Sequence, residues 1–336
     1  MKHMPIFRKT LRSSFLFFLI FLFASFLTKG PIQDVSWAEE FPSKEIKFVV
    51  PYGVGGAMDI SARILSEKAE KILGVPIVVV NNTAGGGAVG AMDVCKAKPD
   101  GYTLLAGSTA IFITQPILRP ELPYRLNDFT TVCMANAQPA GIFVQNDAPW
   151  KSLKELVNYG KQNPGKLRAV VAMAGGGLHV LTELFKLEAG VDITVVPTKG
   201  GAAQSTALMG GHAELCMDIF TPSFNYVKAG RLRILAGTHK IPGLHMIKTF
   251  EEEGFPGVSK INLWLAIFAP KGLPKPILDK LTQAFEKSLK DPSLQEKFLG
   301  TGYLISDYRD PEETSKSIEM EYEIALKVFK QVGMVK

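Results

Sequence analysis

Near the start of the chain, a short apolar run is followed by a glycine-rich turn and then by apolar positions at helical spacing. Ile46 to Val50 is rich in β-branched residues, a pattern typical of a buried strand. The run ends at Pro51 and is followed by the turn-forming residues Gly53, Gly55 and Gly56. From Met58 onwards apolar residues recur at helical spacing, which predicts a helix.

This junction between strand and helix has a chemical consequence. The first N–H groups of a helix have no partner within it, and the helix dipole adds partial positive charge at the same end. Residues 52–57 are therefore a candidate anion site, and Asp59 is a candidate for capping or lining it. The alternative interpretation is a plain tight turn between a strand and a helix.

The sequence of strand, small-residue loop and helix recurs along the first half of the chain. Strands are predicted at 75–80 and 102–106, and the segments 81–87 and 107–109 follow them. Alternating strands and helices favour a parallel, doubly wound sheet. Because ligands bind beyond the carboxyl ends of strands in such sheets, the ends at 51–57, 81–87 and 107–109 are expected to line a site.

A second block repeats this pattern after about residue 129. From there on, strands are predicted at 131–135, 141–145, 167–172, 193–197 and 213–217. Its helices are predicted to begin at the N-cap Ser152 and near Leu178 and Ala202. Strand ends then fall at 174–177, at 198–201 and at Asp218. The chain returns through 232–236 and finishes with a strand at 263–269 and amphipathic helices at about 274–290 and 311–332.

Two α/β lobes are therefore predicted, with a ligand held between them. One domain consists of 39–142 together with 237–336, and the other of 143–236. Their facing strand ends form a clamshell that is expected to close by hinge motion near 141–146 and 232–238.

Residues 1–38 have the composition of a secretory signal peptide. Basic residues precede the Phe/Leu-rich run 15–27, and the small residues Ser36 and Ala38 stand before Glu39. The run is short for a membrane span, so cleavage is predicted in preference to a retained anchor. Without residues 1–38 the net charge falls from +6 to +2, which argues against a nucleic-acid partner.

Motifs for cofactor chemistry and catalysis are incomplete. The run 85–90 matches G-x-G-x-x-G, but the next strand ends without the acidic residue that a dinucleotide fold requires. Ser108 lacks a nucleophile elbow, and the sequence has neither a P-loop nor a metal-binding histidine motif. No cofactor, metal or catalytic residue is therefore predicted. The three widely spaced cysteines are interpreted as small buried residues, although a disulfide among Cys95, Cys133 and Cys216 is left open.

Three polar residues at strand ends have two interpretations each. His179 is either a helix-terminal polar residue or a ligand contact, and Asp218 either orients a ligand or caps the following turn. Lys199 either attracts an anion or is a solvated surface lysine. Backbone donors and a few hydroxyls make up the remaining inventory, which suits holding a small carboxylate without transforming it.

The motifs along the mature chain resemble one family over about residues 41–335. The chain is similar to the solute receptors of tripartite tricarboxylate transporters, the Bug-type periplasmic binding proteins. The segments that carry the resemblance are 41–44, Val50-Pro51-Tyr52 with 55–63, Asn81-Asn82 with 85–87, 99–105, 196–200 and 268–274.

This resemblance implies a two-lobed type II periplasmic binding protein that closes on an organic carboxylate and delivers it to integral membrane transporter subunits. A monomer is expected. A sensing receptor for a regulatory membrane protein and a secreted α/β enzyme are the alternatives. The ligand-binding positions implied by the resemblance and the strand ends are Tyr52, Gly53, Val54, Gly55, Gly56, Ala57, Asp59, Gly85, Ser108, Thr109, Ala174, Gly175, Gly176, His179, Thr198, Lys199, Gly200, Gly201 and Asp218.

Three departures from the family pattern bear on the ligand. Val54 stands where proline is usual, Thr198 where tyrosine is usual, and the segment 172–177 has no hydroxyl. A pocket with fewer hydroxyls favours a bulkier or less polar acid. Because backbone donors are expected to hold the carboxylate, Gly56→Pro is expected to weaken binding more than Lys199→Ala.

Overall fold

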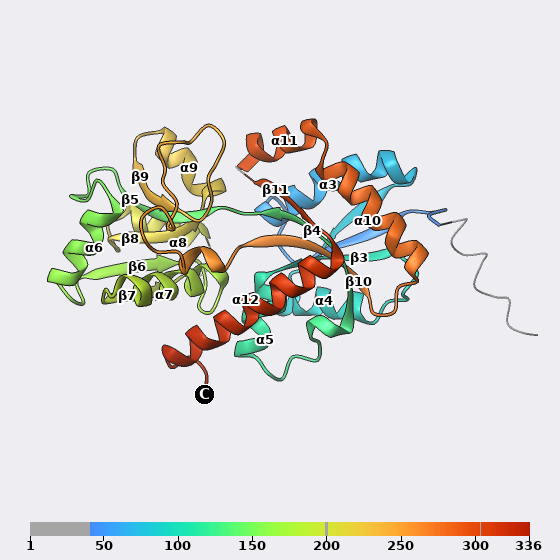
Figure 1. Cartoon of the computed structure of the whole chain (residues 1–336), viewed down its shortest axis with the longest axis horizontal. Helices are drawn as coiled ribbons and strands as arrows, with labels where there is room; N and C mark the ends of the chain where they lie inside the picture. The colour runs from blue at the N-terminus through green and yellow to red at the C-terminus, as the bar shows by residue number, and fades with distance from the viewer. Residues whose placement is uncertain (1–40, 199–200, 303) are drawn as a thin grey trace, which may run out of the picture. The chain divides into compact units, whose positions relative to one another are not determined.

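Two mixed β-sheets, each packed with helices, organise the computed structural model (Figure 1). The structure describes residues 41–198, 201–302 and 304–336, and residues 42–336 form one compact unit. The predicted signal peptide, 1–38, therefore lies outside the described residues, as do Lys199 and Gly200 of the predicted site.

The first sheet has six strands in the order β11-β4-β10-β3-β1-β2. The strands are β1 (Ile46–Val50), β2 (Ile77–Asn81), β3 (Thr103–Ser108), β4 (Phe129–Ala137), β10 (Trp264–Pro270) and β11 (Ile305–Arg309). The helices of this lobe are α3 (Ala57–Leu73), α4 (Ala88–Cys95), α5 (Gln115–Leu118), α10 (Lys275–Leu289), α11 (Pro292–Gly302) and α12 (Pro311–Gln331). Short turns of 3₁₀ or π helix add η1 (Ala84–Gly87), η2 (Ala110–Thr114) and η3 (Leu126–Asp128).

The second sheet has five strands in the order β7-β6-β8-β5-β9. The strands are β5 (Ala140–Gln145), β6 (Leu167–Val171), β7 (Ile193–Pro197), β8 (Leu215–Ile219) and β9 (Leu232–Gly237). The helices are α6 (Leu153–Gln162), α7 (Gly177–Ala189), α8 (Gly201–Met209) and α9 (Phe220–Lys228), and η4 (Val258–Lys260) lies between β9 and β10.

The predicted parallel strands are present, and antiparallel strands complete each sheet. β1 is parallel to β2 and β3, but β10 is antiparallel to both β3 and β4. In the second sheet β6 is parallel to β7 and β8, whereas β5 is antiparallel to β8 and β9. The antiparallel pairs arise where the chain leaves one lobe for the other, because β4 leads into β5 and β9 leads towards β10.

Two segments carry the chain between the sheets, one at 138–139 and the other at 238–263 (Figure 1). They are hydrogen-bonded to each other where they cross: the N–H of Gln138 donates to the carbonyl of Leu263 at 2.7 Å. The N–H of Ala140 donates to Oγ1 of Thr238 at 3.0 Å, and the N–H of Thr238 returns a bond of 2.7 Å to the carbonyl of Ala140. The predicted domain boundaries, after 142 and before 237, fall inside β5 and β9.

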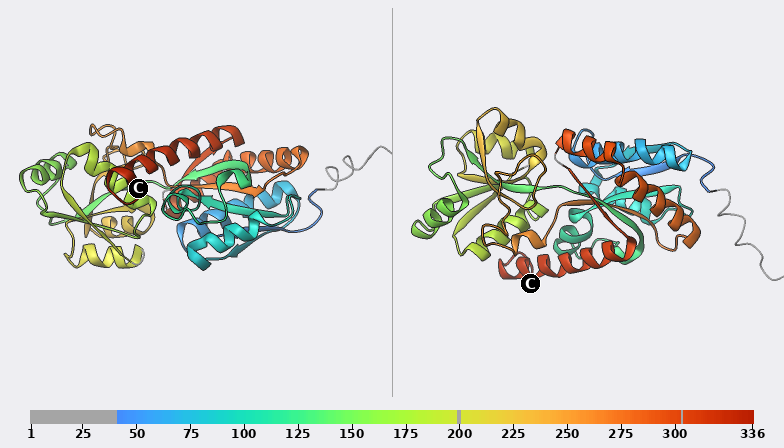
Figure 2. Two further views of the ribbon diagram at one scale, coloured as in Figure 1. Left: turned by 90° about the horizontal axis from the view of Figure 1, so that it is seen from below. Right: turned by 45° about the horizontal axis from the view of Figure 1, so that its top comes forward.

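The core of the first lobe closes over its central strand. Every residue of β10 is buried, and the rings of Phe268 and Phe112 lie 4.3 Å apart. A Cβ added at Gly107 would lie 2.4 Å from Phe268 and 2.5 Å from Phe112, so only glycine fits at this position of β3. The last helix, α12, extends from this lobe and contacts α7 of the other (Figure 2).

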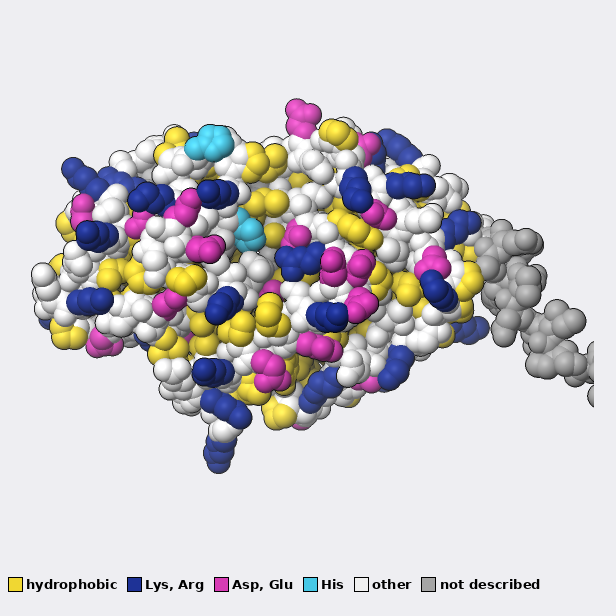
Figure 3. All heavy atoms as spheres, viewed as in Figure 1, with side chains coloured by type: hydrophobic (Ala, Val, Ile, Leu, Met, Phe, Trp, Pro, Cys, Tyr) yellow, Lys and Arg dark blue, Asp and Glu magenta, His cyan; other side chains and the backbone are white. Residues whose placement is uncertain are grey.

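The three cysteines are free, and Cys133 and Cys216 are buried. In the parts of the chain that the structure describes, no helix has both the length and the apolar composition for crossing a membrane. Over the face shown in Figure 3, acidic and basic side chains are interspersed, which agrees with the nearly balanced charge of residues 39–336.

Candidate functional site

A cavity of about 180 Å³ lies where loops of the two lobes meet. The residues around it come from the ends of β1 and β3, the start of α3, the crossing segments, the β6–α7 loop, the end of β8 and the start of β10. The lining consists of Tyr52, Met58, Ser108, Thr109, Ala110, Gln138, Ala172, Met173, Gly176, Gly177, Leu178, Ile219, Leu263 and Trp264. The strand ends of both lobes thus share one cavity.

The carboxylate of Asp59 organises the first glycine loop, residues 52–59. It is 2% exposed and accepts from the N–H of Gly55 at 2.9 Å and from Nδ2 of Asn81 at 2.9 Å. Arg63 binds both of its oxygens, at 3.0 and 2.9 Å. Burial acts to raise the pKa of Asp59, but the hydrogen bonds from Arg63, Gly55 and Asn81 lower it more. Asp59 therefore stays charged and holds the loop, with its oxygens directed into the protein.

The free donors of this loop belong to the start of helix α3. The N–H of Gly55 is taken by Asp59, and that of Gly56 points to the carbonyl of Gly53 at 3.3 Å. Gly56 is the N-cap, with an extended backbone (φ −76°, ψ 164°). The N–H groups of the three residues 57–59 have no partner within the helix, because intrahelical bonding begins at Ile60.

The loop before α7, residues 172–179, has the same hydrogen-bond pattern at the same spacing. The N–H of Gly175 donates to Nδ1 of His179 at 2.8 Å, four residues ahead, as Gly55 donates to Asp59. Gly176 is the N-cap (φ −75°, ψ 170°), and its N–H points to the carbonyl of Met173 at 3.2 Å. Both lobes therefore present a helix N-terminus through one common loop geometry.

Positive φ angles are part of this geometry. Gly55 has φ +79° and Gly175 has φ +68°, a region that side chains other than glycine rarely adopt. His179 continues the parallel between the lobes: its Nε2 lies 3.5 Å from the carboxylate of Glu183, four residues on, as Arg63 follows Asp59. Nδ1 is the acceptor of the hydrogen bond from Gly175, so His179 holds the loop before α7 in place.

The polar groups of the cavity wall are few and mostly bound to one another. Oη of Tyr52 and Oγ of Ser108 are 2.6 Å apart, and burial raises the pKa of Tyr52, which remains a phenol. Thr109 donates to the carbonyl of Asn262 at 2.7 Å. Nε2 of Gln138 lies 2.9 Å from the sulfur of Met58. The other described residues of the wall are glycines or apolar side chains.

A buried acid stands behind the apolar wall. Nε1 of Trp264 donates to Oε2 of Glu321 at 3.1 Å, and the N–H of Asn262 points to the same oxygen at 3.4 Å. Glu321 is 1% exposed, and burial raises its pKa to about 7 against the hydrogen bonds that favour its charged form. Glu321 thus fixes the indole that closes one side of the cavity.

Glu321→Gln is expected to remove part of the pH dependence of stability. The pKa of Glu321 is 4.5 in the unfolded chain and about 7 in the folded protein. Its contribution to the free energy of unfolding is therefore fully present below pH 4.5 and is lost as pH rises through 7. Glutamine keeps an acceptor for Trp264 without this loss. The variant should therefore gain about 2 kcal/mol over the wild type between about pH 5 and pH 8. Urea unfolding at both pH values measures this difference, and equal slopes with pH would contradict it.

Several predicted site residues lie away from the cavity wall. Gly85 is exposed on η1, where its carbonyl accepts from Arg119 at 3.3 Å. The hydroxyl of Thr198 donates to the carbonyl of Val171 at 3.1 Å. Asp218 is buried inside β8 and accepts from Ser223 at 2.5 Å and from the N–H of Ile219 at 2.9 Å. Burial raises the pKa of Asp218 to about 6.

The other predicted residues divide between wall and loop. Tyr52, Ser108, Thr109 and Gly176 line the cavity. The remaining described ones lie on the two loops beside it or at the start of α8, and they are Gly53, Val54, Gly55, Gly56, Ala57, Asp59, Ala174, Gly175, His179 and Gly201. The sequence prediction missed the apolar wall. Met58, Met173 and Leu178 flank the predicted loops and could have been found there, whereas Leu263 and Trp264 come from a distant segment without a local signal.

A larger cavity, of about 650 Å³, lies along α12. Its cations are already engaged: Arg125 donates to the carbonyls of Leu122, Tyr124 and Pro120, and Lys316 binds Glu312 at 2.6 Å. The helix starts in its lining belong only to α5 and η3, of four and three residues, so the smaller cavity is the better candidate for an anion.

The chain is similar to known receptors and binding proteins. Residues 61–334 match the family described as "Tripartite tricarboxylate transporter family receptor". The structure of the periplasmic binding protein BugD is 29% identical, with a TM-score of 0.73, and the match covers 88% of this chain and all of BugD (100%).

Two further similar structures hold carboxylates. Rpa4515 of R. palustris with adipate is 30% identical, with a TM-score of 0.76, over 88% of this chain and 99% of that one. MatC of Rhodopseudomonas palustris with bound malate is 27% identical, with a TM-score of 0.71, over 86% and 99%. These matches confirm the predicted two-lobed binding-protein fold, and they are to receptors and not to enzymes.

Proposed function

Because this chain belongs to the tripartite tricarboxylate transporter receptor family, we propose that it captures a small organic carboxylate outside the cytoplasm and delivers it to a membrane transporter of that type. The proposal includes export through the signal peptide predicted at residues 1–38 and action as a periplasmic monomer. A sensing receptor would use the same pocket, so the membrane partner, and not ligand binding, separates the two roles.

The observation that carries this proposal is the repeated loop geometry on the two sides of one cavity. Each helix N-terminus carries roughly half a unit of positive charge, together with unpaired N–H groups. Gly176 and Gly177 at the start of α7 and Met58 at the start of α3 all line the cavity. A carboxylate placed between α3 and α7 would therefore meet about one unit of positive charge from the backbone alone.

We also propose that ligand binding closes the two lobes. The residues expected from sequence to bend, 141–146 and 232–238, lie largely within the paired strands β5 and β9. The crossing segments at 138–139 and 238–263 are better placed, because they lie between the sheets and are tied to each other by few hydrogen bonds. Gln138 lines the cavity and belongs to the first of these segments, so a ligand would contact the hinge directly.

A thermal-shift screen tests the function. The mature protein should be stabilised by several mono-, di- or tricarboxylates or aromatic acids, by about 2.7 kcal/mol when a ligand is about 100-fold above its Kd. The uncharged amide of each active acid is the matched control, because it keeps the carbon skeleton and removes the anion. An equal shift with acid and amide, or no shift with any acid, would contradict carboxylate capture.

A further inference from the structure

We propose that the cavity selects a monocarboxylic acid with an apolar body over di- and tricarboxylates. This inference rests on the proposed function and adds the ligand class. The proposed ligand class differs from adipate and malate, the dicarboxylates in the two R. palustris structures.

The first argument is charge. Among the described residues, the cavity wall contains no Lys, Arg or His side chain. The two helix N-termini together offer about one unit of positive charge, which matches one carboxylate. A second carboxylate in the cavity would lose its hydration without gaining a cation, and an unpaired buried charge is strongly unfavourable.

The second argument is the use of the hydroxyl donors. Tyr52 and Ser108 are bonded to each other at 2.6 Å, and the hydroxyl hydrogen of Thr109 is directed to the carbonyl of Asn262. Between them these three hydroxyls leave one hydrogen free for a ligand. Outside the helix N-termini, the described wall adds only the Nε2 amide of Gln138, which lies 2.9 Å from the sulfur of Met58. A second carboxylate needs several donors, and these are too few to replace its water shell.

The third argument is the shape of the remaining wall. Apolar side chains contribute from both lobes: Met58, Ala110, Leu263 and Trp264 from the first and its crossing segment, and Ala172, Met173, Leu178 and Ile219 from the second. Glu321 fixes the indole of Trp264 from behind. An aliphatic or aromatic body would bury its surface against both sets when the lobes close, and each buried CH₂ strengthens binding by about fourfold.

Two pairs of acids test the selection, each with one carbon skeleton: hexanoate against adipate, and 4-methylbenzoate against terephthalate. Calorimetric titration of the mature protein should give an affinity at least about tenfold higher for the monocarboxylate of a pair. A dicarboxylate that binds as tightly as its partner, or tight binding of malate or citrate alone, would overturn the inference while leaving carboxylate capture intact. If no carboxylate binds, the proposed function itself fails.

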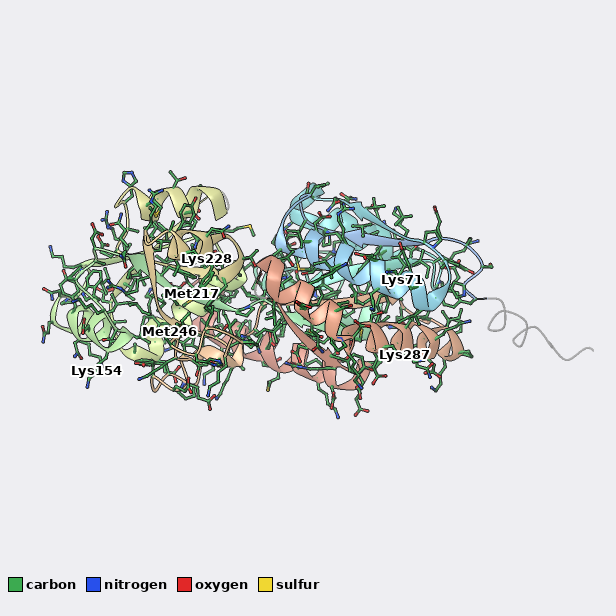
Figure 4. The ribbon with its side chains drawn as sticks, turned by 90° about the horizontal axis from the view of Figure 1, so that it is seen from above. Lys71, Lys154, Met217, Lys228, Met246 and Lys287 are labelled. Atoms are coloured by element: carbon green, nitrogen blue, oxygen red, sulfur yellow. The ribbon has the colours of Figure 1, made fainter. Side chains whose placement is uncertain are left out.

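A designed cation at the edge of the cavity should weaken the selection. Met173 lines the cavity and is 53% exposed, so Met173→Arg places a guanidinium at its edge without burying it. We expect the variant to favour adipate over hexanoate by about tenfold more than the wild type does. Met246→Arg is the matched control, because Met246 is 80% exposed on the segment after β9, in the lobe of the second sheet (Figure 4).

Lys199 lies outside the described residues, and its variant completes the test. If Lys199→Ala removes a preference of the wild type for dicarboxylates, a side-chain cation serves the second carboxylate, and the inference is wrong. We expect Met246→Arg to leave the preference for hexanoate unchanged. A failure of Met173→Arg to shift the preference relative to this control would also count against the inference.

Discussion

Asp59→Ala is expected to lower the free energy of unfolding by about 3 kcal/mol and to weaken ligand binding by at least about tenfold. The change removes the acceptor of Gly55, Asn81 and Arg63 at once. It leaves the N–H of Gly55 without a partner, and Nδ2 of Asn81 keeps only its bond to the carbonyl of Tyr52. The loop then loses the bond that sets its geometry ahead of α3. Urea unfolding and calorimetric titration measure the two effects.

Arg63→Ala is the matched control for this change. The side chain of Arg63 is 49% exposed, and its removal leaves the bonds of Asp59 to Gly55 and Asn81 in place. A loss of about 1 kcal/mol or less is expected, with binding largely kept. If Arg63→Ala weakens binding as much as Asp59→Ala, the ion pair and not the loop bond determines the geometry of the site.

Gly87→Ala is expected to lower the free energy of unfolding by about 3 kcal/mol or more. Gly87 has φ +91°, and an added Cβ would lie 2.7 Å from the carbonyl oxygen and 2.8 Å from Cβ of Pro51. The chain turns there against the end of β1, so relief requires movement of backbone next to the first glycine loop. Thermal or urea unfolding gives the measurement.

Gly74→Ala separates conformational strain from the clash. Gly74 has φ +77° as the C-cap of α3, and an added Cβ meets nothing within 4 Å. Its expected loss is about 1 kcal/mol, the effect of a positive φ alone. If Gly87→Ala and Gly74→Ala lower the free energy of unfolding equally, the backbone at Pro51 moves away from the added Cβ at little cost.

The sequence predicts features that are set locally. The β1–loop–α3 unit, the strand at 193–197 and the N-cap of α6 are in place, and Oγ of Ser152 accepts from the N–H of Glu155 at 3.2 Å. These depend on short-range signals: β-branched runs, glycine turns and capping residues. The two glycine loops also share a spacing of four residues, from Gly55 to Asp59 and from Gly175 to His179. This spacing can be recognised in the sequence only after the bond from Gly175 to His179 is known.

The rest of the fold depends on contacts between distant residues. The order of strands, the antiparallel β10 between β3 and β4, and the walls supplied by Leu263 and Trp264 have no local signal. The short helix α11 and the edge strand β11 were not predicted at all, although Asp291-Pro292 is a helix-start signal that could have indicated α11. Asp218 was predicted at a strand end, but β8 continues to Ile219 and encloses its carboxylate.

Backbone φ angles are a further feature that the sequence alone does not predict. Gly56→Pro was expected to disrupt the loop, but Gly56 has φ −76°, which proline adopts readily. The N–H that proline would remove makes only a long contact of 3.3 Å with Gly53. The substitution is therefore a weaker test than expected, and Gly55, with φ +79°, is the glycine of this loop that the geometry requires.

The proposed backbone origin of the anion site has an evolutionary consequence. Residues such as Met173, Leu178 and Ile219 shape the cavity but donate none of the bonds that hold Asp59 or His179 in the two loops. Mutations at these wall positions can accumulate without dismantling the anchor for the acid group. A gene duplicate could in this way change its ligand specificity through substitutions at a few apolar positions. A mutant library confined to the same positions should yield variants that bind different acids.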